Sequence, residues 1–235
     1  MDARNESQPA AANRVVIVDD HPLFRAALTS AVSDACATGE LFEADSVAAM
    51  LDTLERHPGV DLLLLDLSLP GAHGFSALAY LRGAYPQLPV VIVSALDDPT
   101  TVQQAMAFGA QGFLSKSGSA DSICASVRAV LRGDVVTPAG YRDAGVGSPD
   151  RATLEVAERL AQLTPQQFRV FSKLCSGRLN KQIAYEMQIT EATVKAHMTV
   201  IMRKLGAANR TQTALLAARL TLNPDEIKDQ PEEPE

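Results

Sequence analysis

The chain has 235 residues, enough for one large or two ordinary domains, and 46% of them are hydrophobic while 21% are charged. These proportions exclude a disordered or fibrous protein. Three widely separated cysteines exclude a disulfide scaffold or a thiolate zinc site and fit a reducing compartment. No apolar run is long enough to cross a bilayer, and the polar first residues are unlike a secretory signal. We therefore expect a soluble, cytoplasmic protein with no membrane partner.

The net charge of −7 is spread unevenly along the chain. Residues 13–134 carry 14 acidic and 7 basic side chains, whereas residues 159–222 carry 10 basic and only 2 acidic ones. The last segment, 223–235, is acidic again. A basic segment of this size inside an acidic chain predicts a module that binds a polyanion such as nucleic acid.

The first 134 residues alternate short apolar runs with amphipathic stretches. The runs lie at 15–18, 41–42, 62–65, 90–93 and 112–114. They are continuous, as in strands that are buried on both faces of a parallel sheet. Five strand–helix repeats over 14–134 therefore predict an α/β domain with a doubly wound, five-stranded parallel sheet. Residues 1–13, which precede it, are expected to be disordered.

The second half of the chain has a different composition. Six proline, glycine and serine residues between 138 and 149 predict a linker over 135–158. Residues 159–222 contain no strand pattern but four helical segments, with Thr164 and Thr190 as N-caps and Gly177 and Gly206 as stops. We expect a separate, all-α domain of four helices. The acidic tail, 223–235, is expected to be disordered.

Polar side chains follow the predicted strands of the first domain. They are Asp19, Asp20, Asp66, Ser94 and Lys116. Because the carboxyl ends of parallel strands meet at one edge of the sheet, we expect these side chains to converge. Three carboxylates repel one another unless a cation lies among them, and oxygen ligands of this kind suit Mg²⁺. One carboxylate can then act as a nucleophile toward a phosphoryl group, while the metal and the lysine neutralise the transferred oxygens.

A single aspartate at a strand end more often caps the following helix, but matching residues at four strand ends favour the phosphoryl site. The segments at 19–25 (DDHPLFR), 66–71 (DLSLPG), 94–95 and 109–116 (GAQGFLSK) resemble the flavodoxin-like receiver domain of bacterial response regulators of the NarL/FixJ subfamily. The resemblance implies that Asp66 is the phosphoacceptor. It implies Mg²⁺ ligands from Asp19, Asp20, Asp66 and the backbone carbonyl of Ser68. It also implies that Lys116 pairs with the phosphoryl group, that Ser94 is the switch hydroxyl and that Phe113 is the switch aromatic residue.

Two helices of the basic module are joined by a short turn at 188–190. On a helical wheel, the second helix places Val194, Met198, Ile201 and Leu205 on one face. The opposite face carries small residues and two cations, which suits entry into a major groove. A solvated charged face would interleave acids with bases, whereas here only Glu191 opposes the cations. We expect double-stranded DNA to be contacted by Lys181, Thr193, Lys195, Ala196, Thr199, Arg203, Lys204 and Arg210.

The segments at 163–165, 180–184, 193–197 and 204–206 resemble the LuxR-type helix-turn-helix domain. The chain departs from that pattern at Gln167 (usually Glu), at Gln188 (often Gly) and at Thr199 (a base-reading Lys in some members). The resemblance implies a homodimer, on DNA or when phosphorylated. The dimer contact would come from Thr213, Ala214, Leu216 and Ala217, in keeping with a two-fold DNA site.

Together these features predict a two-component response regulator that receives its phosphoryl group from a histidine kinase and acts as a transcription factor. One alternative is a Mg²⁺-dependent phosphatase, which is disfavoured because Ser68 stands where haloacid-dehalogenase enzymes need an aspartate as acid and base. Another is a DNA-binding protein whose receiver no longer takes phosphate, which the intact set of acidic-site residues disfavours. The opposite charges of the two modules are compatible with a closed state, in which the receiver lies against the second helix of the helix-turn-helix (the recognition helix).

Overall fold

The computed structural model describes residues 13–35, 39–72, 74–138, 141 and 149–221. The segments expected to be disordered, 1–13 and 223–235, therefore fall almost wholly outside the described residues. The strands are β1 (Arg14–Val18), β2 (Glu40–Ala44), β3 (Leu62–Asp66), β4 (Val90–Ser94) and β5 (Gly112–Ser115). All pair in parallel in the order β2-β1-β3-β4-β5, which confirms the doubly wound sheet.

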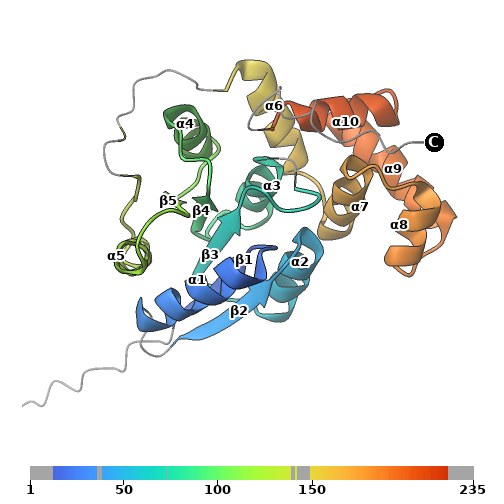
Figure 1. The fold of residues 1–235 in the computed structure, drawn as a ribbon. Helices are drawn as coiled ribbons and strands as arrows, with labels where there is room; N and C mark the ends of the chain where they lie inside the picture. Colours follow the sequence, from blue (N-terminus) through green and yellow to red (C-terminus); the bar gives the residue numbers. More distant parts are fainter. Residues whose placement is uncertain (1–12, 36–38, 73, 139–140, 142–148, 222–235) are drawn as a thin grey trace, which may run out of the picture.

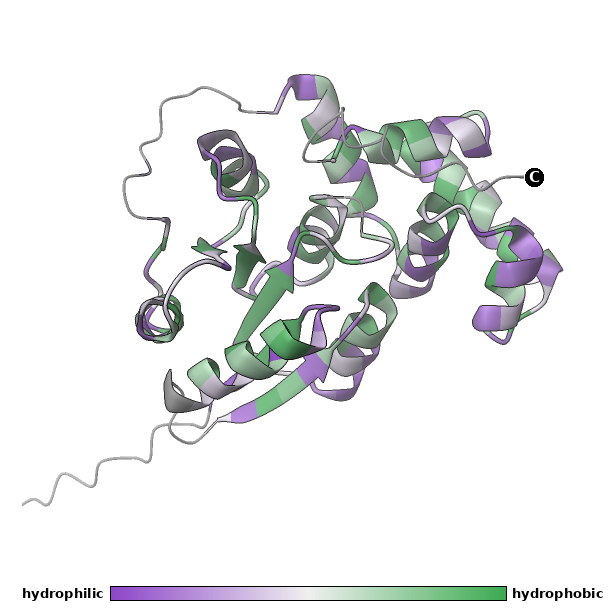
Figure 2. Cartoon of the chain, in the orientation of Figure 1, coloured by the Kyte–Doolittle hydropathy of each residue, from purple (hydrophilic) through white to green (hydrophobic). Residues whose placement is uncertain are grey.

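Helices cover both faces of this sheet (Figure 1). Helices α1 (Pro22–Ala35) and α5 (Ala120–Leu131) lie on one face, and α2 (Val47–Arg56), α3 (Ser76–Ala84) and α4 (Pro99–Ala107) lie on the other. Successive side chains of β1 alternate between the two faces, with Val15 and Ile17 on the side of α1. Because both faces are covered, the inner strands β1, β3 and β4 are apolar along most of their length, as Figure 2 shows for β3, whereas the edge strand β2 includes Glu40 and Glu43.

The second domain contains only helices among its described residues. They are α6 (Arg151–Leu160), α7 (Pro165–Cys175), α8 (Asn180–Glu186), α9 (Glu191–Leu205) and α10 (Arg210–Ala218). Thr190 caps α9, and Gly206 ends it in the left-handed conformation at φ 70°. Helix α6 begins inside the linker expected over 135–158, and Val156 and Leu160 on α6 are buried in the core of the protein. The linker pattern of proline and glycine ends before this helix begins.

The two domains pack against each other, and their buried side chains form one continuous cluster. Helix α3 contacts α6, and α2 contacts α7. The rings of Tyr80 and Phe168 stack with 4.1 Å between their centroids. At the margin of this contact, Arg169 of α7 donates hydrogen bonds to Asp52 at 2.6 Å and to Glu55 at 3.0 Å. The domain contact is therefore an apolar core with a charged rim.

Candidate functional site

The predicted acidic site forms at the carboxyl edge of the sheet. Asp19 follows β1, Asp66 ends β3, Ser94 ends β4, and Lys116 follows β5. The parallel register pairs Asp66 with Val93 and Ser94 with Ser115, so these strand ends lie level with one another. Asp19 and Asp66 are each 1% exposed. The structure thus brings together residues that are far apart in the sequence.

Lys116 connects two of the carboxylates. Its Nζ lies 2.7 Å from Asp19 Oδ2 and 2.8 Å from Asp66 Oδ2. Burial disfavours the ammonium ion, but the hydrogen bonds to both carboxylates outweigh burial, so the pKa of Lys116 is raised above its usual value. The amino group is therefore charged at neutral pH, beside the oxygens that a phosphoryl group would join.

The carboxylates fit a divalent cation. Asp19, Asp20 and Asp66 each offer an oxygen, and His21 a ring nitrogen, and these atoms all lie within 4.8 Å of one another. One lysine balances only one of three carboxylates, so the cluster keeps an excess of negative charge. The side chain of Asp20 is 28% exposed and opens the cluster to solvent. Carboxylate oxygens with access to water match Mg²⁺, which usually keeps several water ligands.

The other predicted receiver residues lie just after β3 and on the strands β4 and β5. The amide of Ser68 donates a hydrogen bond to Asp66 Oδ1 at 3.1 Å, which orients the carboxylate. Ser94 is fully buried, and its Oγ accepts a hydrogen bond from the amide of Leu96 at 3.1 Å. Phe113 is also fully buried on β5, so its ring occupies an inward position.

Three residues beside the cluster were not predicted as part of it. His21 Nδ1 lies 2.9 Å from Asp20 Oδ1, and Lys116 Nζ lies 4.8 Å from the centre of the Phe24 ring. Arg25 donates a hydrogen bond to the carbonyl oxygen of Asp19 at 2.6 Å. All three lie within a few residues after the paired aspartates, just before or in the first turn of α1. This closeness in the sequence was the one feature from which their place beside the cluster could have been predicted.

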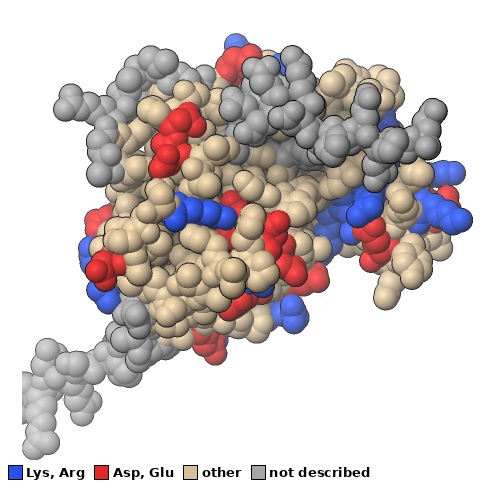
Figure 3. All heavy atoms as spheres, in the orientation of Figure 1, with Lys and Arg blue, Asp and Glu red and all other residues tan. Residues whose placement is uncertain are grey.

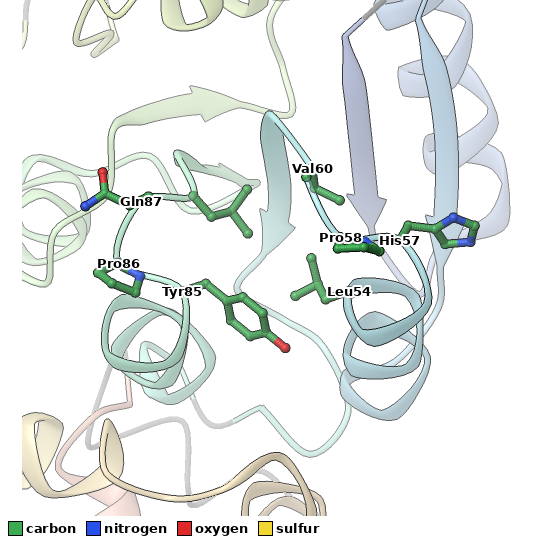
Figure 4. A pocket seen from close by; sticks show the side chains of 9 residues that line it. Leu54, His57, Pro58, Val60, Tyr85, Pro86 and Gln87 are labelled. Atoms are coloured by element: carbon green, nitrogen blue, oxygen red, sulfur yellow. The ribbon is translucent and has the colours of Figure 1, made fainter.

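A separate apolar hollow of about 350 Å³ lies near the opposite edge of the sheet (Figure 4). It lies between the end of α2 and the loop that follows α3, and its lining includes Leu54, Val60 and Tyr85. None of its nine lining residues is a carboxylate or a lysine. This hollow therefore lacks the carboxylates and the lysine that define the acidic site.

Helices α8 and α9 present the predicted DNA-binding surface. The residues of the expected set that are exposed to solvent are Lys181, Thr193, Lys195, Ala196, Thr199 and Arg203. Lys181, Lys195 and Thr199 contribute to the lining of a hollow of about 700 Å³. The face of α9 that the helical wheel assigned to the core is buried, which confirms that part of the prediction. Figure 3 shows Lys and Arg gathered at the side of the molecule where Figure 1 places α7 to α9.

Lys204 and Arg210 make contacts inside the domain instead of pointing freely to solvent. Lys204 Nζ donates a hydrogen bond to Gln167 Oε1 at 2.8 Å, and the same oxygen accepts one from the amide of Thr164. Arg210 donates hydrogen bonds to Asn180 Oδ1 at 3.2 Å and to the carbonyl oxygen of Arg178. Both cations therefore stabilise the domain, whatever they add to DNA binding.

The turn between α8 and α9 carries local strain. Gln188, at φ 54°, is the one non-glycine residue with a positive φ among the described residues. This conformation costs an L-residue about 1–2 kcal/mol, a cost that glycine would remove. Glycine also loses more conformational entropy on folding, which offsets part of that stabilisation. We expect Gln188→Gly to raise the free energy of unfolding by about 1 kcal/mol in thermal denaturation. Tyr185→Gly, at an exposed position inside α8, is the control and should be destabilising; a similar loss for Gln188→Gly would contradict the strain.

Helix α10 corrects half of the expected dimer contact. Thr213 and Ala217 are 0% and 2% exposed, so they face the core of their own domain. Ala214 and Leu216 are partly exposed, and Leu215, which was not predicted, is 64% exposed. Small residues suit both a close helix contact inside a domain and a close contact between subunits, and the sequence pattern does not distinguish the two.

The receiver does not cover the recognition helix, so this expectation is also corrected. The residues of α9 that are expected to face a DNA groove, such as Lys195 and Thr199, remain exposed. The contact between the domains instead uses α6 and α7 on one side and α3 and α2 on the other. Apolar burial decides this arrangement, with opposite charges paired only at its rim.

Comparisons with known proteins agree with this geometry. Residues 15–128 match the family described as response regulator receiver domain, and residues 161–217 match bacterial regulatory proteins of the luxR family. The chain is 39% identical to the glycerol metabolism activator of Pseudomonas putida over 87% of this chain and 94% of that one. It belongs to the response regulators that join a receiver domain to a LuxR-type DNA-binding domain.

One further relative and one solved structure match most of the length of the chain. The chain is 33% identical to the probable transcriptional regulatory protein NarL of Mycobacterium tuberculosis, over 89% of this chain and 95% of that one. Among solved structures, RcsB of Salmonella typhimurium shares the fold with a TM-score of 0.51 and 19% identity, over 88% of this chain and 98% of that one. No helix within the described ranges has the length and apolar character needed to cross a membrane.

Proposed function

We propose that this response regulator accepts a phosphoryl group on Asp66 from a histidine kinase in the cytoplasm. Phosphorylation then controls its binding to double-stranded DNA as a homodimer. The buried contact of Lys116 with Asp19 and Asp66 carries the proposal, because it places a charged amino group beside a carboxylate at the sheet edge. A solved structure described as two RcsB dimers bound to two parallel DNAs supports DNA binding as a dimer.

In the proposed transfer, an oxygen of Asp66 forms a bond to phosphorus while the bond from phosphorus to the donor imidazole nitrogen breaks, and the electron pair stays on that nitrogen. Lys116 neutralises charge on the transferred oxygens. Mg²⁺ held by Asp19, Asp20, Asp66 and the backbone carbonyl of Ser68 would supply further positive charge. Because position 68 offers no acid, we expect the phosphoryl group to stay on Asp66 as a signal instead of passing through a catalytic cycle.

The signal would then pass through Ser94 and the loop that follows it. The Ser94 hydroxyl is buried at the end of the strand next to β3, where it can turn from the amide of Leu96 toward a phosphoryl group on Asp66. Phe113 lies on the next strand and has no hydroxyl to stabilise an exposed orientation. We infer that its ring stays inward and that movement of the loop after Ser94 carries the change.

The test is phosphorylation of the full chain by a small-molecule phosphodonor. With Mg²⁺ the wild-type protein should gain one phosphoryl group by intact mass, and EDTA should prevent the gain. Asp66→Asn should abolish it, because an amide is not a nucleophile toward phosphorus. Asp121→Asn, at an exposed position in the first turn of α5, is the matched control and should leave it unchanged. Equal labelling of Asp66→Asn and the wild type would refute the site.

We expect Lys195 to contact DNA bases and Lys181 to contact DNA phosphates. Lys195 lies in the first half of the recognition helix, where side chains reach base edges. Lys195→Ala should cost about 1–3 kcal/mol of binding on a selected duplex and much less on a scrambled one. Lys181→Ala should weaken both duplexes alike and lower the salt slope by about one unit. Affinities across a salt series measure both effects, and equal losses on the two duplexes for Lys195→Ala would contradict base readout.

A further inference from the structure

Thr199 lies at the middle of the groove-facing surface of α9. It is exposed, and its Oγ1 donates a hydrogen bond to the carbonyl oxygen of Lys195 at 3.0 Å, one turn earlier in the helix. The hydroxyl proton is therefore held by the helix itself, an arrangement open to threonine in helices. Thr199 consequently has a methyl group, and no free hydroxyl proton, to offer to a base.

The neighbouring residues of this surface also offer methyl groups. Ala192 and Ala196 are exposed and end in methyl groups. The hydroxyl of Thr193 lies 2.9 Å from the hydroxyl of Thr190 at the start of the helix, so it takes part in the cap. Beside the ammonium group of Lys195, the central part of the groove-facing surface therefore presents methyl groups.

Base edges in the major groove carry one apolar group, the C5-methyl group of thymine, and otherwise hydrogen-bond donors and acceptors. When a methyl surface of the protein lies against a hydrogen-bond donor or acceptor of a base, that polar group is left unpaired. When it lies against the methyl group of thymine, the apolar surfaces of both the protein and the base are removed from water. Resting on the DNA binding proposed above, we propose that Thr199, with Ala196, recognises the C5-methyl group of thymine. This contact would set a preference for a T·A pair beside the base that Lys195 contacts.

The experiment begins with selection of duplexes from a random pool by the full chain, treated with phosphodonor and Mg²⁺. Each thymine of the selected half-site is then replaced by uracil, which lacks only the methyl group, and affinities are measured. At one position the wild-type protein should lose about fourfold in affinity, as expected for one methyl group left in water. Replacing that T·A pair by 5-methylcytosine·G should recover more affinity than replacing it by C·G.

Two variants separate the methyl group of Thr199 from its hydroxyl. Thr199→Val keeps the methyl group and should keep the fourfold discrimination. Thr199→Ser keeps the hydroxyl and should discriminate between the thymine and uracil duplexes much less than the wild type does. Thr193→Ser is the matched control at the helix start and should behave as the wild type does.

Each result decides the question. Discrimination that survives in Thr199→Ser but is lost in Thr199→Val would show that the oxygen reads the base, and the inference would be wrong. A selected duplex with no uracil-sensitive position would overturn it while leaving the proposed function intact. If selection enriches no sequence at all, sequence-specific DNA binding itself fails, and the inference fails with it.

Discussion

Replacing Lys116 by methionine is expected to lower the free energy of unfolding of the receiver domain by about 3–5 kcal/mol at neutral pH without Mg²⁺. Lys116 is the cation between Asp19 and Asp66, whose side chains are each 1% exposed. Methionine has a similar length but no charge, so two buried carboxylates would face each other without a partner. Chemical denaturation in EDTA measures the loss.

Mg²⁺ should restore most of this stability, because a cation again lies among the carboxylates and binds only the folded state. The double variant Lys116→Met/Asp19→Asn should be closer to the wild type than the single variant, since one of the two uncompensated charges is gone. The pKa of Lys116 is raised on folding, so its contribution is complete below the unfolded value of about 10.4 and is lost as the pH rises through the folded value. A single variant that matched the wild type in EDTA would refute the role of the lysine.

Gly83→Ala is expected to separate the two domains. A Cβ atom at Gly83 would lie 2.5 Å from the carbonyl oxygen of Ala161 and close to two other atoms of the same residue. Backbone atoms cannot turn away as a flexible side chain can, so α3 and α6 would have to move apart. Meanwhile alanine favours the helix by about 1 kcal/mol over glycine, so the receiver itself should not be weakened. Small-angle scattering of the full chain should show a larger radius of gyration.

Ala84→Ser is the matched control for this experiment. It also adds one heavy atom, at the next and exposed position of the same helix, and should leave the radius of gyration unchanged. A compact Gly83→Ala protein would mean that α3 and α6 are not in close contact in solution.

Much of the fold and the acidic site could be predicted because local patterns determine them. Asp19, Asp66 and Lys116 each stand at the end of an apolar run, and parallel pairing brings such ends to one edge. The capping residues Thr190 and Gly206 likewise predicted where α9 begins and ends.

Contacts between distant elements could not be predicted in the same way. Thr213 and Ala217 were expected in a dimer contact, yet they are buried in their own domain. A helical wheel shows which residues share a face but not which partner covers that face. The place of α6 in the core did not follow from the sequence, because its buried side, with Val156 and Leu160, acquires partners only when the chain has folded.

The hydroxyl group of Tyr80 has a consequence for the contact between the domains. It is buried at the domain contact and has no hydrogen-bond partner among the described residues, and this burial raises the pKa of Tyr80 well above its usual value. An unsatisfied buried hydroxyl costs about 1–3 kcal/mol, and parting of the domains would return it to water. The ring of Tyr80 therefore stabilises the domain contact by stacking on Phe168, whereas its unsatisfied hydroxyl destabilises the same contact. Rehydration of this hydroxyl would therefore offset about 1–3 kcal/mol of the free energy that is lost when the two domains part.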